Sequence, residues 1–296
     1  MSDTQVSLRR KIDGAVKLES VVRTMKAVAA SSIGQYEAAV RALADYERSV
    51  ELGLSVCFRQ GWPTSVPSSG KKVKGTVGVI VFGSDQGLVG QFNEAMAEFV
   101  ESTLPTLPGE KKIWAVGEHM NARLADAGLP LAGKFGVPSS VKAITSLVGR
   151  LQVASEAPGE GACTEVQVFH TRPTSGGLFE PVRQRLLPLD EQWQKDLAQI
   201  HWPTKNLPEL FGRDEATLRA FIREFLFISL FKACAESLAS ENASRLAAMQ
   251  RAEKNIDSLL KNLNRTFHRL RQSSIDEELF DVIAGFNALS QKRATS

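Results

Sequence analysis

Residues 225–270 read FLFISLFKACAESLASENASRLAAMQRAEKNIDSLLKNLNRTFHRL and form the centre of a longer stretch with helical composition. After Pro208 there is no further proline, and glycine occurs only at Gly212 and Gly285. Residues that favour helices dominate instead. A helix over residues 207–290 would be roughly 120 Å long at about 1.5 Å per residue. Because a helix folded over a compact core is much shorter, this one needs another helix or another protein along its length.

Apolar and small residues also repeat with a helical period near the N-terminus. Between Leu18 and Val50 they recur in steps of four and three, at Leu18, Val22, Met25, Ala29, Ser32, Tyr36, Ala39, Leu43, Tyr46 and Val50. A mean period of about 3.5 residues is typical of a coiled-coil seam. We therefore expect an N-terminal coiled-coil helix over residues 1–58. A linker rich in Gly, Pro and Ser follows between Gly61 and Gly70.

The composition changes between these two segments. Residues 74–83 (KGTVGVIVFG) are typical of a strand buried on both faces. Further strands are predicted at residues 112–116, 130–135, 165–171 and 181–187, and helices at residues 92–104, 118–127 and 139–155. This alternation predicts a Rossmann-like, mostly parallel α/β domain over residues 74–190. The last two strands are joined by a short turn, which favours an antiparallel hairpin at one edge.

The C-terminal stretch has its own seam, at Phe225, Ile228, Lys232, Ala235, Ala239, Asn242, Leu246, Met249, Glu253, Ile256, Leu260, Leu263, Phe267 and Leu270. The terminal helices should therefore pair as one antiparallel coiled coil with the α/β domain inserted between them. The C-terminal helix is about 30 residues longer, so about 40 Å of it should lack a partner within the chain. Its end stays apolar, with Leu279, Phe280, Val282, Ile283, Phe286 and Leu289. Such a helix needs cover from another protein.

Charge and cysteine content exclude several classes of protein. A net charge of +3 and the lack of long basic runs give no support for a nucleic-acid or membrane-surface partner. The N-terminus lacks the apolar segment of a signal peptide, and no stretch is apolar enough for insertion into a bilayer, so we expect the chain on the cytosolic side. The three cysteines are Cys57, Cys163 and Cys234, and their spacing indicates packed thiols, without a disulfide or zinc site.

The sequence contains few candidates for catalysis. The four histidines are scattered, at His119, His170, His201 and His268, and a structural or solvated role is expected for each. HExxH, GxSxG and Walker A patterns are absent. We therefore expect no catalytic residue, no cofactor and no metal ligand in this chain.

One glycine-containing turn allows two interpretations. Gly83-Ser84-Asp85-Gln86-Gly87-Leu88-Val89-Gly90 lies between a predicted buried strand and a predicted helix. A dinucleotide site would have GxGxxG here, whereas the spacing is GxxxGxxG. Ordinary strand-to-helix turn chemistry, with Asp85 or Ser84 as the helix cap, explains the stretch at least as well.

Several stretches resemble the gamma subunit of F-type ATP synthases over essentially the full length of the chain. They are residues 22–31 (VRTMKAVAAS), 84–93 (SDQGLVGQFN), 240–249 (SENASRLAAM) and 271–275 (RQSSI). The last two, in this order and near the C-terminus, form a specific signature. The resemblance implies a rotor shaft that couples ion flow through a membrane ring to conformational cycling of the catalytic beta subunits.

The resemblance also implies partners and contact residues. The partners are the hexamer of alpha and beta subunits, the epsilon subunit and the ring of c subunits, at the cytoplasmic face of a bacterial inner membrane. Met25, Lys26 and Arg245 match positions near a beta-subunit lever loop, and Arg271 and Gln272 match positions at a beta-subunit catch loop. Composition alone explains Arg245 and Arg271 as well by a solvated helix face. Gln86, Val89 and Gly212 depart from the family pattern, which indicates a divergent branch.

Two other functions agree with parts of the sequence. A nucleotide-dependent α/β enzyme with a coiled-coil oligomerisation arm would use the turn at residues 83–90 and would bind nucleotide as an isolated chain. A cytoskeletal or scaffolding coiled coil would self-associate through identical helices. The rotor-shaft hypothesis predicts instead that the chain is recovered together with alpha and beta subunits.

Overall fold

A computed structural model describes residues 4–59, 75–155, 163–174, 179–206, 208 and 215–294, with side chains given up to residue 285. The predicted linker around Gly61 to Gly70, Gly212, and the side chains of Phe286 and Leu289 lie outside this description. The chain divides into two compact units, Met1–Val28 with Ala247–Ser296, and Ala29–Leu246. We call them the terminal unit and the α/β unit.

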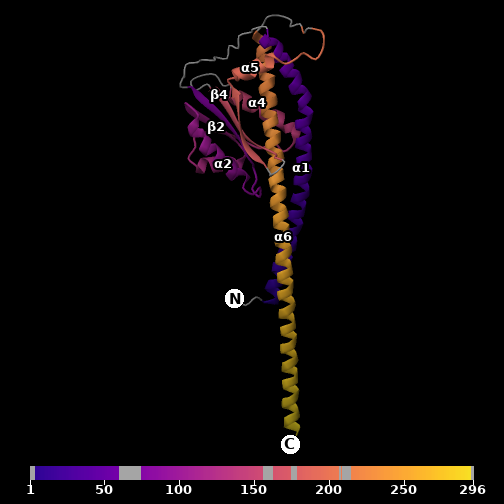
Figure 1. The fold of residues 1–296 in the computed structure, drawn as a ribbon. Coiled ribbons are helices and arrows are strands. Elements are labelled where there is room, and N and C mark those ends of the chain that lie inside the picture. The colour runs from indigo at the N-terminus through magenta and orange to yellow at the C-terminus, as the bar shows by residue number, and fades with distance from the viewer. Residues whose placement is uncertain are drawn as a thin grey trace. The chain divides into compact units, whose positions relative to one another are not determined.

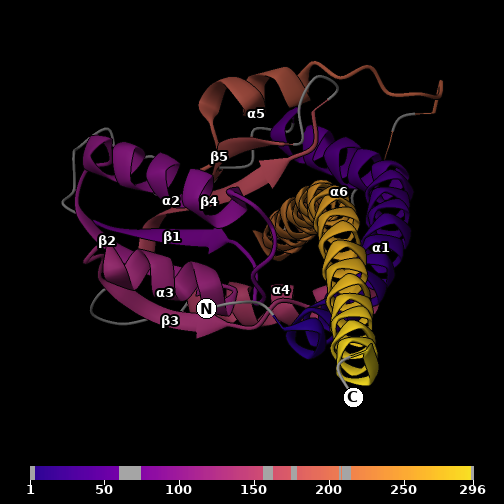
Figure 2. The same cartoon turned by 90° about the horizontal axis from the view of Figure 1, so that it is seen from below.

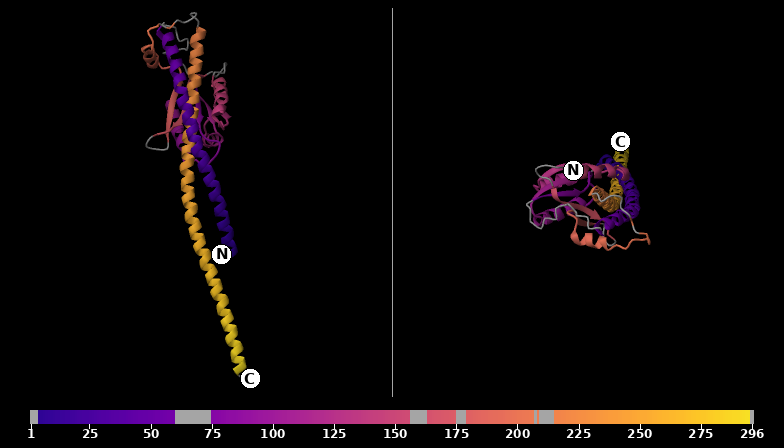
Figure 3. Two further views of the ribbon diagram at one scale, coloured as in Figure 1. Left: turned by 90° about the vertical axis from the view of Figure 1, so that its right-hand side faces the viewer. Right: turned by 90° about the horizontal axis from the view of Figure 1, so that it is seen from above.

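Two long helices, α1 (Gln5–Arg59) and α6 (Glu215–Ala294), each contribute to both units. Within the α/β unit they run side by side in opposite directions (Figure 1, Figure 3), since Glu47 contacts Lys232 whereas Gly53 lies against Phe221. Within the terminal unit Lys26 contacts Glu253. The predicted antiparallel pairing of the two terminal helices is thereby confirmed.

The α/β unit contains one five-stranded sheet in the order β3-β2-β1-β4-β5. Its strands are β1 (Thr76–Phe82), β2 (Glu110–Val116), β3 (Leu131–Phe135), β4 (Cys163–Arg172) and β5 (Glu180–Leu187). β1 pairs in parallel with β2 and β4, and β2 pairs in parallel with β3. β5 is antiparallel to β4, which confirms the predicted hairpin at one edge. The mostly parallel sheet places the strand ends, and the turns that follow them, at one edge.

Both faces of this sheet are covered, as the apolar and almost wholly buried central strand β1 requires. Helices α2 (Phe92–Thr103) and α3 (Glu118–Asp126) pack on one face around Val79, Met96 and Met120. The single turn η1 (Leu104–Thr106) ends α2. Helix α4 (Val141–Ser155) packs on the other face together with α6.

Within the α/β unit, α6 lies between the sheet and α1 (Figure 2). Most side chains from residue 226 to 244 are therefore buried, whichever face of the helix they are on. Small residues such as Ala233, Ala235 and Ala239 allow the close approach on several sides. Over these residues α6 therefore packs against the sheet, α4 and α1.

The N-terminal seam differs from the prediction at two positions. Leu18 and Tyr46 are 59% and 45% exposed, while the next residues, Glu19 and Glu47, are half-buried. A straight helix of 3.6 residues per turn drifts by about 20° per heptad from a 3.5-residue repeat, so the inward position moves by one residue. Glu47 is tolerated there because it pairs with Lys232 at 3.0 Å. The C-terminal seam is buried or half-buried at every predicted residue.

A short helix, α5 (Glu191–Ala198), was not predicted from the sequence. The Asp190 carboxylate caps it by accepting hydrogen bonds from the amides of Gln192 and Trp193. The indole of Trp193 packs on Phe225 with the ring centroids 4.6 Å apart. This contact ties α5 to α6.

The opposite end of α5 is bound to α1. The guanidinium of Arg59 donates hydrogen bonds to the carbonyl oxygens of Ala198 and Ile200 at the C-terminus of α5. A positive charge is favoured at this end of a helix dipole. In the ranges that the structure describes, no helix combines the length and the apolar character needed to cross a bilayer.

Candidate partner-contact sites

Four of the five residues matched to beta-subunit contacts lie in the terminal unit. Met25 and Lys26 are on α1, and Arg271 and Gln272 are on α6. Met25 and Lys26 are half-buried, whereas Arg271 and Gln272 are exposed. Arg245 belongs to the α/β unit. The five residues are thus divided between the two units.

Lys26 belongs to an ion-pair cluster between α1 and α6, in which Glu253 is the shared partner. Its Nζ lies 2.5 Å from Oε2 of Glu253, and Nε of Arg23 lies 3.5 Å from the other oxygen. The hydrogen bond from Lys26 is the largest cause that lowers the pKa of Glu253, and the charges of both cations lower it further. The Lys26 side chain remains 34% exposed, so its charge is still accessible from outside.

Met25 is half-buried in the seam of α1, and it also belongs to a second apolar stripe beside the seam. We define the outer stripe as Leu18, Val21, Met25 and Val28, which are spaced by three and four residues and share one helix face. Leu18, Val21 and Val28 are 59%, 55% and 59% exposed. The outer stripe is an apolar surface that extends along roughly three turns of helix.

The contact between α1 and α6 ends near Ser274. Half-buried residues recur along α6 at Ile256, Leu260, Leu263 and Leu270, and Ser274 is the last of them. Every described side chain from Ile275 to residue 285 is exposed. This exposed part includes five large apolar residues, which we call the apolar tip: Ile275, Leu279, Phe280, Val282 and Ile283. The expected unpaired end of the helix is thus present within the terminal unit.

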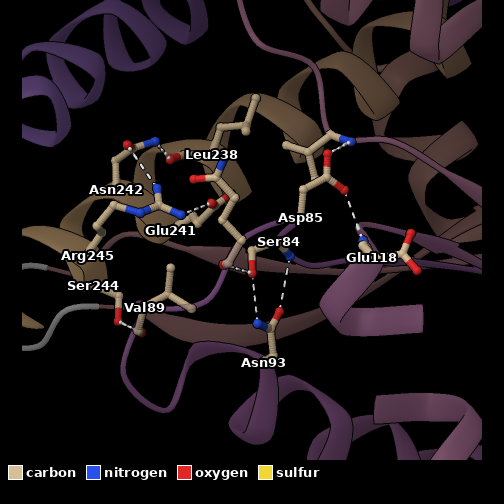
Figure 4. A network of polar contacts seen from close by, with 12 residues as sticks. Ser84, Asp85, Val89, Asn93, Glu118, Leu238, Glu241, Asn242, Ser244 and Arg245 are labelled. Atoms are coloured by element: carbon tan, nitrogen blue, oxygen red, sulfur yellow. Dashed lines mark hydrogen bonds and ion pairs between the residues drawn. The ribbon is translucent and has the colours of Figure 1, made fainter. Parts of the chain in front are cut away.

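The turn after β1 contacts the family signature on α6. Figure 4 shows the two stretches facing one another. The hydroxyl of Ser244 donates a hydrogen bond of 2.5 Å to the carbonyl oxygen of Val89. Asn93 holds the start of the turn, since its side chain accepts from the Ser84 amide and donates to the Ser84 hydroxyl. Leu88 adopts a left-handed conformation (φ 63°) and is 63% exposed.

The capping role predicted for Asp85 or Ser84 is wrong for the helix that follows them. The N-cap of α2 is Gln91, whose side chain makes no capping hydrogen bond. Asp85 instead accepts hydrogen bonds of 2.9 Å from the amides of Glu118, at the start of α3, and Val137. Because parallel strands end at one edge of a sheet, the turn after β1 lies beside the turn after β2. The carboxylate also puts negative charge where dinucleotide phosphates would need positive partners.

Arg245 is bound within α6. Its guanidinium donates a hydrogen bond of 2.6 Å to Glu241 and one of 3.4 Å to the amide oxygen of Asn242 (Figure 4). The side chains of Arg245 and Glu241 are 13% and 7% exposed. Sequence reasoning gave Arg245 a role in partner contact and missed this internal pair, although the spacing of four residues on a helix could have indicated it.

The histidines and cysteines do not form a common site. His119, His201 and His268 are exposed, whereas His170 is buried and bonds through Nε2 to Glu236 at 3.0 Å. The thiols of Cys57 and Cys234 are buried and that of Cys163 is half-buried. Burial raises the pKa of all three thiols, which favours the protonated form.

The chain is similar to known proteins over nearly all of its length. The family model described as ATP synthase matches residues 4–289. The "ATP synthase gamma chain" of Parafrankia sp. (strain EAN1pec) is 28% identical, over 95% of this chain and 96% of the relative. The "ATP synthase gamma chain" of Polaromonas naphthalenivorans (strain CJ2) is 26% identical, over 95% and 98%.

Solved structures share the fold. A chain of the Euglena gracilis mitochondrial ATP synthase, in the part that contains OSCP, F1 and the c-ring, aligns with a TM-score of 0.64 at 16% identity. The alignment covers 96% of this chain and 94% of that one. A chain of the central stalk and c-ring of the Tetrahymena thermophila mitochondrial enzyme aligns with a TM-score of 0.54 at 22% identity, over 78% and 99%.

Proposed function

This chain belongs to the gamma-chain family of ATP synthases, whose members form the rotor shaft of the central stalk, and on that premise we propose which of its surfaces meet the other subunits. The partners are the alpha/beta hexamer, the epsilon subunit and the c-ring. Ion flow turns the ring and the shaft together. The catalytic sites belong to the beta subunits, and this chain contributes the moving surface that acts on them.

The apolar tip carries this proposal. Its five residues are between 46% and 70% exposed on the helix. A soluble helix with this much apolar surface is stabilised when another protein surrounds it. The hexamer of alpha and beta subunits supplies such a collar around the end of α6. Arg271 and Gln272 precede the tip and are exposed, which suits hydrogen bonds to a beta-subunit loop.

The outer stripe supplies a second contact with the hexamer. Met25 lies within this stripe and Lys26 follows it, so an apolar strip and a positive charge would meet a beta-subunit loop together. Apolar contact contributes affinity, while the charge favours one orientation of an acidic loop over others. We retain Arg245 in the proposed contact set, although its side chain is only 13% exposed.

The mechanism follows from the difference between the faces of the shaft. One face of α1 in the terminal unit is apolar, while the ion-pair cluster of Arg23, Lys26 and Glu253 makes another face polar. A beta subunit that prefers one of these faces is stabilised in a different conformation at each angle of the shaft. The rotor thus shifts the population of beta-subunit states by its orientation.

The proposal includes the domain division and the location of the chain. Residues 1–58 and 207–290 form the stalk, and residues 74–190 form the α/β domain that meets epsilon and the ring. The named relatives come from bacteria. We therefore place the complex at the cytoplasmic face of the bacterial inner membrane, with this chain as a peripheral subunit.

Co-purification tests the proposed function. A tag on this chain, expressed with the alpha and beta subunits of the same source, should recover both subunits in stable complex and with ATPase activity. A variant shortened after Ser274 is the matched comparison, because it lacks the apolar tip and keeps the seam. Recovery of no alpha or beta subunit with the full chain would reject the rotor function, and equal yield and activity with the shortened chain would reject the collar.

A further inference from the structure

Glu241 and Arg245 form a charged pair in the buried part of α6. Their side chains are 7% and 13% exposed, and the guanidinium Nη2 lies 2.6 Å from Oε1 of Glu241. Removing a charge from water costs several kcal/mol unless a partner compensates it. Helix propensity does not require a carboxylate at this position. A charged pair in this buried stretch therefore points to a role beyond forming the helix.

The pair lies where α6 meets the turn after β1. Ser244, which precedes Arg245, donates to the Val89 carbonyl in that turn, and Asn242 is oriented by a hydrogen bond to the carbonyl of Leu238. The charged or titratable groups around Glu241 are Tyr36 from α1, Cys234 and Arg245 from α6, and Asp85 from the turn. Among them, Arg245 supplies the only permanent positive charge. Within the described residues the buried Nε of Arg245 has no hydrogen-bond partner, while its two Nη atoms donate to Asn242 and Glu241.

We propose that Arg245 is an internal positioning residue, which neutralises Glu241 inside α6 and so keeps the Ser244 face of the helix against the turn of residues 84–90. Without the guanidinium, a buried carboxylate would face this turn, where the carboxylate of Asp85 has the same sign. The turn would then separate from the helix, or Glu241 would take up a proton. The role concerns the chain alone and does not depend on contact with a beta subunit.

The charge of Glu241 gives this inference a pH dependence. Burial raises the pKa of Glu241, the charge and hydrogen bond of Arg245 lower it, and Asp85 raises it. Loss of Arg245 therefore raises this pKa further. A protonated Glu241 needs no cation, so the cost of losing Arg245 should be large when Glu241 is ionised and should decrease as the pH falls. A role in packing alone would show no such trend.

Unfolding of the purified full-length chain by urea tests the pair. Arg245→Met should lower the folding equilibrium constant about 10- to 100-fold at about pH 8, because an uncompensated charge is left in the interior. The loss should shrink clearly at about pH 5, near the range where carboxyl groups titrate. Arg245→Lys, which keeps the charge, should retain most of the stability, and Arg265→Met on an exposed part of the same helix is the control.

The double variant Glu241→Gln/Arg245→Met separates coupling from simple loss of packing. If the pair acts as one unit, the double variant should be more stable at about pH 8 than Arg245→Met alone. Additive losses, or a loss from Arg245→Met that is the same at both pH values, would overturn the proposal. If Arg245→Met does not fold at about pH 8, folding of the double variant at that pH would support the pair as one unit, whereas failure of the double variant to fold would overturn the proposal.

The position of the turn gives an independent spectroscopic readout. A nitroxide label on Leu88→Cys, in a Cys163→Ala background, would report the mobility of the turn, since Leu88 is exposed whereas Cys57 and Cys234 are buried. The label should become more mobile in Arg245→Met at about pH 8 and should regain order on acidification. Unchanged mobility would overturn the proposal. Neither measurement contains alpha or beta subunits, so its failure would leave the rotor function unaffected.

Discussion

Replacing three residues of the apolar tip should weaken assembly without weakening the fold. The variant is Ile275→Ser/Leu279→Ser/Val282→Ser, at side chains that are 53%, 56% and 70% exposed. Complete burial of such a side chain stabilises by about 1.5–3 kcal/mol, so covering the exposed half contributes about 1 kcal/mol for each. The sum of about 3 kcal/mol corresponds to a roughly 100-fold weaker association with the hexamer. The isolated chain should unfold at nearly unchanged urea concentration.

The matched control replaces three acidic residues of the same stretch by serine, in Glu277→Ser/Glu278→Ser/Asp281→Ser. All three are exposed, and both variants carry the same number of serines in the helix. The assay is titration of the purified chain into an alpha/beta preparation, followed by recovery of the complex and its ATPase activity. If the apolar variant and the acidic control assembled equally well, the reasoning about the collar would be refuted.

Three further substitutions test the fold and the ion-pair cluster. Gly117→Ala should destabilise the chain by on the order of 2 kcal/mol in urea, because φ is +112° and a Cβ would lie 2.6 Å from the Ser84 carbonyl oxygen. Equal stability would contradict this. Trp193→Ala should lower the free energy of unfolding by about 2–4 kcal/mol, because it leaves a cavity against its aromatic neighbours. A decrease of less than about 0.5 kcal/mol would show that α5 adds little to stability. Lys26→Met should reduce stability above the unfolded pKa of Glu253, and the deficit should vanish as the pH falls through its lowered folded pKa. A deficit that persists in acid would mean that Lys26 acts mainly by packing.

The sequence predicted the long elements because their signals are repeated many times. The seam of α6 continues for more than ten turns, so single charged residues within it, such as Lys232 or Glu253, do not hide its period. The β-branched run of β1 was similarly clear. In contrast, α5 has only eight residues and two inward apolar side chains, too few for a periodic signal. The available signal was the N-cap at Asp190 followed by Glu191, which is typical of a helix start.

Local polar contacts were harder to predict, because they depend on which segments meet in space. Asp85 caps a helix that begins 33 positions later, and only the sheet order brings the two together. Glu47 likewise takes a half-buried position because its partner Lys232 comes from the other long helix, far away in the sequence. Met25, Lys26, Arg271 and Gln272 are accessible on the helix surface, and their contact with beta subunits stays a prediction.

Helix α6 passes through three successive environments, and this has a consequence for how its backbone amides exchange with solvent hydrogen. From residue 226 to 244 an amide opens only when the surrounding layers separate, so its exchange should approach the rate set by global unfolding. From residue 249 to 274 one neighbouring helix protects it, and beyond Ile275 fraying alone is sufficient. The isolated chain should therefore show a protection gradient along one continuous helix. Leu238 and Leu279 have the same side chain, yet evolution would retain Leu238 for its part in folding. It would retain Leu279 for its contact with the protein that surrounds the apolar tip.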